Sequence, residues 1–166
     1  MNKELFLTLY KSLIRSHFDY GNLIYYPSTK KNKQIIENAQ RRATRIVPEL
    51  QGLSYEQRLI ALNLTTLEYR RRRYDLIQTY RIIRNEDNID SSIFFKFSDN
   101  DLRGHPFKLV KPRATKSIRL HSFSHRVVTP WNILPTDIVC AKDTVSFKTK
   151  LDKYWSGRRF DLTDIY

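Results

Sequence analysis

The chain has 166 residues, of which 40% are hydrophobic, so it suits one globular domain or a domain with a small subdomain. Its formal net charge of +13 favours an anionic partner such as nucleic acid. No apolar run approaches the roughly 20 residues of a membrane span, no signal-peptide pattern opens the chain, and the single cysteine excludes an internal disulfide. We therefore expect no membrane partner and an intracellular location, nuclear or cytoplasmic, rather than secretion.

Two helices are expected in the first 50 residues. Residues 2–16 carry a leucine every four positions, and residues 30–47 form a second amphipathic stretch ended by Pro48. The apolar stripe expected to be buried on the second helix comprises Ile35, Ile36, Ala39, Ala43, Ile46 and Val47. The basic side of this helix comprises Arg41, Arg42 and Arg45.

Residues 54–84 contain two helix-start signals. Ser54 with Gln57, and Thr65 with Glu68, both fit the capping-box pattern. They predict a short helix over residues 55–62 and, after a turn, a longer one over residues 66–84.

The longer helix is expected to place different residue types on different sides. Glu68, Asp75 and Thr79 form a side expected to be solvated and charge-paired, with Arg71 and Arg72 at its edges. Two apolar flanks, one with Tyr69, Leu76, Tyr80 and Ile83 and one with Leu67 and Tyr74, enclose a stripe of Arg70, Arg73, Arg81 and Arg84. These stripe arginines either bury their stems and pair with acids or face a phosphate backbone.

The second half of the chain is less regular. Residues 102–130 hold seven Lys or Arg residues and no acid, and are expected to be extended or loop, with a short strand over residues 117–123. Trp131 and a last helix over residues 144–155 are expected to clamp this segment, and residues 156–166 are expected to form a frayed tail. The predicted organisation is a helical segment over residues 1–50, a helical extension over residues 51–155 with the basic loop 102–130, and the tail over residues 156–166.

No enzymatic centre is visible in the sequence. There is no phosphate-binding loop, nucleophile elbow or carboxylate pair that would hold two magnesium ions. His121 and His125 have a spacing that zinc ligands use, but the accompanying cysteine pairs are missing and the segment is strongly basic. We expect no catalytic residue, no metal and no cofactor in this chain.

Seven short blocks of the chain, read in order, resemble the C-terminal region of non-LTR (LINE-type) retrotransposon reverse transcriptases. They are LYKSLIRSHFDYGN (residues 9–22), IENAQRRATR (36–45), LSYEQRL (53–59), LNLTTLEYRR (62–71), DLIQTY (75–80), RVVTPWNILP (126–135) and SFKTKLDKYW (146–155). In that family the region follows the palm domain, and its first helices are the thumb that grips the template–primer duplex. The fingers, the palm with its catalytic aspartates and the endonuclease are absent here, so the resemblance implies a non-catalytic fragment of an RNA-directed DNA polymerase.

The expected fold is mainly α: a helical thumb-like hairpin, a central Arg-rich helix pair, an irregular basic segment and a C-terminal helix. The expected function is binding of RNA or an RNA–DNA duplex, with the palm and fingers of a parent polymerase as protein partners. The candidate phosphate contacts are Arg41, Arg42, Arg45, Arg70, Arg73, Lys108, Lys111, Arg113, Lys116 and Arg119. Two alternatives stay open: a scaffold that packs on a missing palm without touching nucleic acid, and a helix-turn-helix DNA binder built on residues 55–84.

Overall fold

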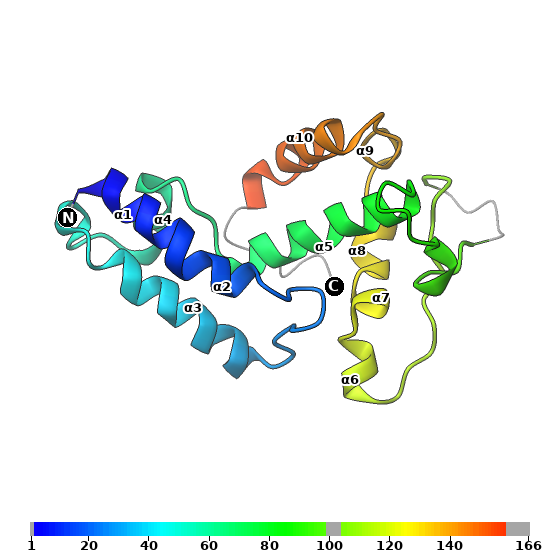
Figure 1. The fold of residues 1–166 in the computed structure, drawn as a ribbon, viewed down its shortest axis with the longest axis horizontal. Helices are drawn as coiled ribbons and strands as arrows, with labels where there is room; N and C mark the ends of the chain where they lie inside the picture. Colours follow the sequence, from blue (N-terminus) through cyan, green and yellow to red (C-terminus); the bar gives the residue numbers. More distant parts are fainter. Residues whose placement is uncertain (1, 99–103, 159–166) are drawn as a thin grey trace. The chain divides into compact units, whose positions relative to one another are not determined.

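The computed structural model describes residues 2–98 and 104–158, which form a mainly helical fold (Figure 1). The chain divides into two compact units, Met1–Arg72 and Arg73–Tyr166, so the boundary falls inside the long helix α5 (Leu67–Ile83). Each unit has a core of its own. The part of the expected tail beyond residue 158 lies outside the described residues.

The first unit begins with a helical hairpin. Helix α1 (Lys3–Leu9), a π-helical turn (Tyr10–Arg15) and α2 (Ser16–Asp19) follow one another without a break, and α3 (Lys30–Thr44) returns antiparallel to them (Figure 1). Thr29 begins α3, because its hydroxyl accepts a hydrogen bond from the Asn32 amide at 3.1 Å. The two arms are joined by the buried hydrogen bond from the Tyr10 hydroxyl to Gln40, at 2.5 Å.

The predicted apolar stripes of this hairpin are only partly buried. On α1 and the π-helical turn that follows it, Phe6 and Tyr10 are buried, whereas Leu5, Leu9 and Leu13 are 52%, 41% and 62% exposed. On α3, Ala43 and the following Val47 are buried, but the prediction that Ile35 and Ile46 are buried was wrong, since both are more than half exposed. A stripe defined by sequence spacing is wider than the area that the neighbouring arm covers.

Helix α4 (Tyr55–Ala61) and α5 begin close to where the sequence predicts. The Ser54–Gln57 capping box is confirmed, with Ser54 and Gln57 each bonded to the other's backbone amide. The second box was predicted one residue early. The hydroxyl that caps α5 belongs to Thr66, which accepts from the Tyr69 amide at 3.2 Å, and the Glu37 carboxylate on α3 accepts from the Leu67 amide at 3.0 Å.

The second unit contains the rest of α5, four short helices and α10 (Thr144–Tyr154). The predicted strand over residues 117–123 was wrong: α6 (Ser117–Leu120) and α7 (Phe123–Arg126) occupy it, followed by α8 (Val128–Asn132) and α9 (Thr136–Val139). The core of the unit is aromatic. Tyr80 stacks on Phe147 with ring centroids 4.4 Å apart, and Phe147 in turn contacts Trp131 at 6.1 Å.

The side of α5 that the sequence predicted to be solvated is buried. Asp75 and Thr79 are 4% and 0% exposed. Asp75 forms a two-pronged ion pair with Arg126 of α7, in which Nε and Nη2 each lie 2.9 Å from a carboxylate oxygen. Spacing along the helix could not show this, because the partner lies 51 residues away in a segment expected to be extended or loop.

Replacing Asp75 with alanine leaves the Arg126 charge buried without its carboxylate, so we expect a loss of about 3–5 kcal/mol in the free energy of unfolding. Urea denaturation measures this loss. The matched control is Asp152→Ala, which removes a solvent-exposed partner of Arg73 and should cost no more than about 1 kcal/mol. Equal losses in the two variants would contradict the role assigned to the buried pair.

Candidate nucleic-acid interface

The last turns of α3 and the start of α4 bring four arginines together, which we call the α3 basic patch: Arg41, Arg42, Arg45 and Arg58. The first three are exposed, because Gln40, Ala43 and Thr44 occupy the buried side of the same turns. Arg58 is buried from α4, donating to the Thr44 hydroxyl at 3.1 Å and to the Leu53 carbonyl at 2.7 Å. Sequence reasoning missed Arg58, since nothing in its spacing distinguishes it from an ordinary surface arginine.

The α3 basic patch has a concentrated positive charge. Burial, together with the nearby charges of Arg45 and Arg41, lowers the pKa of Arg58. Arg41 lies over the Tyr55 ring, 4.5 Å from its centroid, and Arg58 approaches the same ring at 5.7 Å. The guanidinium groups of Arg41 and Arg58 therefore both lie against an aromatic ring, but only Arg41 is exposed, so the surface charge of the patch comes from Arg41, Arg42 and Arg45.

A buried hydrogen-bond network fixes Tyr55 and, through it, the patch. The Tyr55 hydroxyl donates to the Glu37 carboxylate and accepts from Gln40 Nε2 at 2.7 Å. Gln40 also donates to the Thr65 carbonyl at 3.0 Å and accepts from Tyr10. Burial raises the pKa of Glu37, against the lowering effect of its hydrogen bonds from Tyr55 and Leu67.

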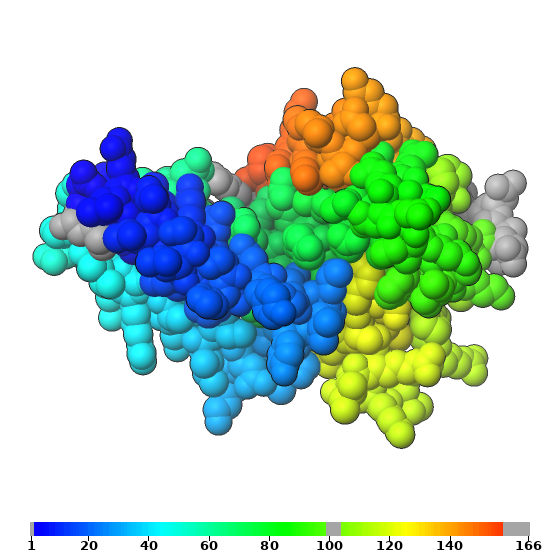
Figure 2. All heavy atoms as spheres, in the orientation of Figure 1, coloured from blue at the N-terminus to red at the C-terminus, as the bar shows by residue number. Residues whose placement is uncertain are grey.

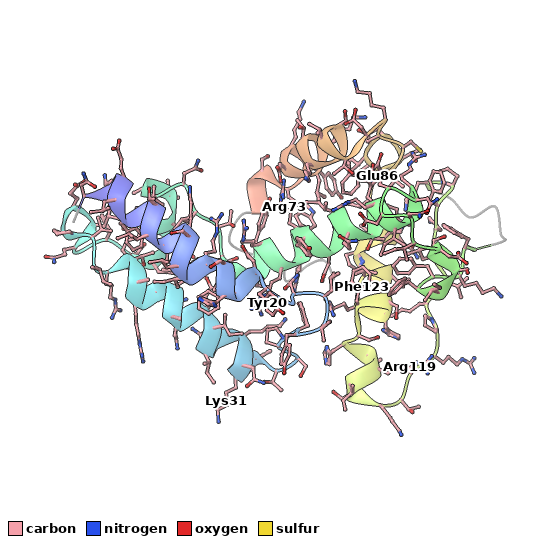
Figure 3. The ribbon with its side chains drawn as sticks, in the orientation of Figure 1. Tyr20, Lys31, Arg73, Glu86, Arg119 and Phe123 are labelled. Atoms are coloured by element: carbon pink, nitrogen blue, oxygen red, sulfur yellow. The ribbon has the colours of Figure 1, made fainter. Side chains whose placement is uncertain are left out.

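The second basic surface is the basic loop, with Lys108, Lys111, Arg113, Lys116 and Arg119. Its backbone is tied to α7 and α8. The Trp131 indole donates to the Phe107 carbonyl at 2.8 Å, the Asn132 amide group bonds both the N–H and the C=O of Leu109, and His125 donates to the Pro112 carbonyl at 3.0 Å. Of these five side chains, Lys108 is half-buried and the other four are exposed, and Arg119 extends from α6 in Figure 3.

The arginines of α5 that were predicted to contact phosphate are ion-paired within the fold. Arg70 grips Asp19 with Nε–Oδ1 and Nη2–Oδ2 distances of 2.7 and 2.6 Å, and Arg73 grips Asp152 at 2.6 and 2.8 Å. Arg81 pairs with Asp87, and Arg84 lies 4.9 Å from the Phe107 ring centroid. The arginine stripe is therefore closed by acids and ring faces, and Arg70 and Arg73 are the weakest of the predicted phosphate contacts.

His105 and His125 form structural hydrogen bonds with backbone carbonyls. His105 is buried and donates to the Trp131 carbonyl at 3.0 Å, and burial lowers its pKa. Within residues 2–98 and 104–158, no group of three or more His, Cys, Asp or Glu side chains is placed to hold a metal ion.

No family model, curated protein or solved structure is significantly similar to this chain. Among the helices that the structure describes, none combines the length and the apolar character needed to cross a membrane.

The raised pKa of Glu37 predicts a pH dependence of stability. Below the ordinary value of 4.5, the carboxyl is protonated in both folded and unfolded chains. As the pH rises above it, the unfolded chain loses this proton first, so the free energy of unfolding falls until the pH passes the raised folded pKa. Glu68, Asp90 and Asp143 have lowered pKa values and change the stability in the opposite direction. Urea titrations at several pH values should therefore show the contribution of Glu37 as a difference between the wild type and a variant without its carboxyl group.

In Glu37→Gln this contribution should disappear, so the stability difference between the two proteins should change across the same pH window. A difference that stays constant with pH would show that Glu37 does not titrate as its burial implies. Glu4→Gln, which changes an exposed glutamate of α1, is the matched control and should run parallel to the wild type.

Proposed function

We propose that this chain binds nucleic acid through its phosphate backbone, using the α3 basic patch and the basic loop. The observation that carries the proposal is the uneven distribution of ion pairs. Among the described residues, no carboxylate lies within salt-bridge distance of the exposed cations Arg41, Arg42, Arg45, Lys111, Arg113, Lys116 and Arg119, whereas Arg70, Arg72, Arg73 and Arg81 of α5 all have one.

This distribution matters because the chain has carboxylates that could have paired with the exposed cations. It has 17 Asp and Glu residues, and the described ion pairs form mainly with arginines of α5. Cations left together on a surface repel one another, which disfavours the compact state unless an anion binds there. Regularly spaced phosphates satisfy such a surface without sequence specificity.

The resemblance to the thumb and post-thumb region of non-LTR reverse transcriptases narrows the proposed ligand to the template–primer, an RNA or an RNA–DNA duplex. The proposed role is binding rather than catalysis, in an intracellular compartment, nuclear or cytoplasmic, alongside the palm and fingers of a parent polymerase. The position of Arg41, Arg42 and Arg45 on the return arm of a helical hairpin supports this assignment.

Salt dependence tests the proposal. Fluorescence anisotropy with a labelled RNA–DNA duplex should show log Kd rising with log salt, with a slope of about 0.9 per phosphate neutralised. Replacing Arg41, Arg42 and Arg45 with glutamine should weaken binding and reduce that slope by about 2–3. Arg81→Gln, which removes an already paired arginine, is the control and should leave the slope unchanged.

Absence of duplex binding at low salt, or binding that salt does not weaken, would overturn the proposal. So would a triple variant that binds as well as Arg81→Gln. Melting temperatures of all variants should stay close together, since the three arginines of α3 are exposed.

A scaffold role is the second candidate, and a specific observation favours it. Leu5, Leu9, Leu13 and Ile14 form an exposed apolar stripe on the first arm of the hairpin, with Ile14 38% exposed. A stripe of this kind is typical of a surface covered by another protein. The scaffold role predicts that the isolated chain self-associates and that Leu9→Lys abolishes this association. If scaffolding is the whole function, the chain should not bind the duplex.

The helix-turn-helix alternative has no such support. The residues near the start of α5 that would read bases are occupied: Arg70 holds Asp19, and Arg71 and Arg72 are 8% and 7% exposed. A recognition helix needs its N-terminal side chains free to enter the major groove.

A further inference from the structure

The first unit contains an aromatic hollow beside the loop that joins α2 to α3. It measures about 540 Å³, within the range of roughly 300–1,000 Å³ typical of ligand pockets. Its lining includes His17, Phe18, Tyr20, Tyr25, Tyr26 and Arg71. Tyr20 lies where the chain leaves α2 (Figure 3), and Figure 2 shows this loop at the surface of the unit.

The loop that carries the tyrosines is anchored at its start. Asp19 is held by both prongs of Arg70, and the buried Asn22 amide donates to the Arg71 carbonyl at 3.2 Å. Between them Gly21 adopts a φ of 63°, which favours glycine. Its carbonyl accepts from the amides of Ile24 and Tyr25 at 2.9 and 2.7 Å, so Tyr25 is positioned by a hydrogen-bonded turn.

The tyrosines of this anchored loop are unusually open. Tyr20 and Tyr25 are 88% and 82% exposed, and the intervening Ile24 is 85% exposed. Rings this exposed contribute almost nothing to the core. An anchored loop that presents two such rings beside a hollow is therefore better explained by a ligand than by packing.

The charge of the lining selects the kind of ligand. No Asp or Glu lines the hollow; the neighbouring Asp19 is engaged by Arg70. Arg71 lines the hollow and is 8% exposed, and its Nη2 donates to the Phe18 carbonyl at 3.3 Å. Lys33 lies over the Tyr26 ring at 5.5 Å, but Glu68 pairs with it at 2.7 Å and offsets its charge. A cationic ligand would meet the Arg71 charge with no lining carboxylate to offset it. A nucleotide, by contrast, can stack its base on the rings and turn its phosphate toward the positive charge.

We propose that this hollow binds an unpaired nucleotide of a single-stranded nucleic-acid segment, with the base stacked on Tyr20 or Tyr25 and its phosphate toward Arg71. The inference deepens the proposed function and rests on it: the α3 basic patch and the basic loop hold duplex phosphates, and the hollow takes a base that is not paired. Stacking on ring faces tolerates any base, so no sequence preference is expected.

The test compares two probes, a labelled eight-nucleotide oligo(U) and a blunt RNA–DNA duplex, by fluorescence anisotropy. Tyr20→Ala with Tyr25→Ala should weaken oligo(U) binding at least about fivefold for each ring that stacks, while duplex affinity changes less than about twofold. Tyr20→Phe with Tyr25→Phe should retain oligo(U) affinity, because the rings remain. Tyr154→Ala, at a partly exposed tyrosine of α10, is the control and should change neither.

Several results would overturn the inference. If the double alanine variant keeps its oligo(U) affinity while the wild type binds duplex in the expected salt-dependent way, the hollow is not the site and the proposed function stands. If oligo(U) and duplex affinity fall together, the tyrosines act through the fold. Binding of a decaproline peptide that the double alanine variant loses, without any loss of oligo(U) binding, would assign the hollow to a peptide. A wild type that binds neither nucleic acid would overturn the proposed function and this inference with it.

Discussion

The ion pair between Asp75 and Arg126 is the constraint on which the second unit depends. Both side chains are almost fully buried, at 6% and 3% exposure, so neither charge is tolerable without the other. Satisfying the pair brings α7 onto α5 although 51 residues separate them. The segment between them runs beside α7 and α8, where hydrogen bonds from Trp131, Asn132 and His125 hold its backbone. The exposed cations of the basic loop are thus carried on a segment that has little regular structure but a fixed path.

In the first unit the buried polar groups form a hydrogen-bond network of neutral side chains that ends at one carboxyl group. Tyr10, Gln40 and Tyr55 pass hydrogen bonds along a buried chain to Glu37, which also caps the first amide of α5. The network fixes Tyr55, whose ring lies beneath Arg41. In both units the buried polar groups set the position of basic side chains that the fold itself does not neutralise, and this is the physical basis for proposing an anionic partner.

Much of the local structure could be predicted because it depends on neighbouring residues. The Ser54 capping box, the ends of α4 and α5 and the last helix follow from short-range spacing, and the Glu68–Arg72 pair forms as expected, at 2.5 Å. Errors arose where the partner is distant. Asp75 was expected in solvent because its nearest opposite charges in sequence are on its own helix. Residues 117–123 were expected to form a strand because helices of four residues carry too little periodicity to recognise.

The sequence by itself determined that the chain is mainly helical, strongly basic and built around an arginine-rich helix, since composition and periodicity are properties of the chain alone. Which of the arginines are free was decided only by the tertiary structure. Arg70 and Arg41 are indistinguishable by residue type, yet one meets Asp19 and the other a tyrosine ring. The aromatic hollow likewise depends on Asn22 reaching the backbone of Arg71, 49 residues away. Pairing is a property of positions in space, and spacing along the chain does not encode it.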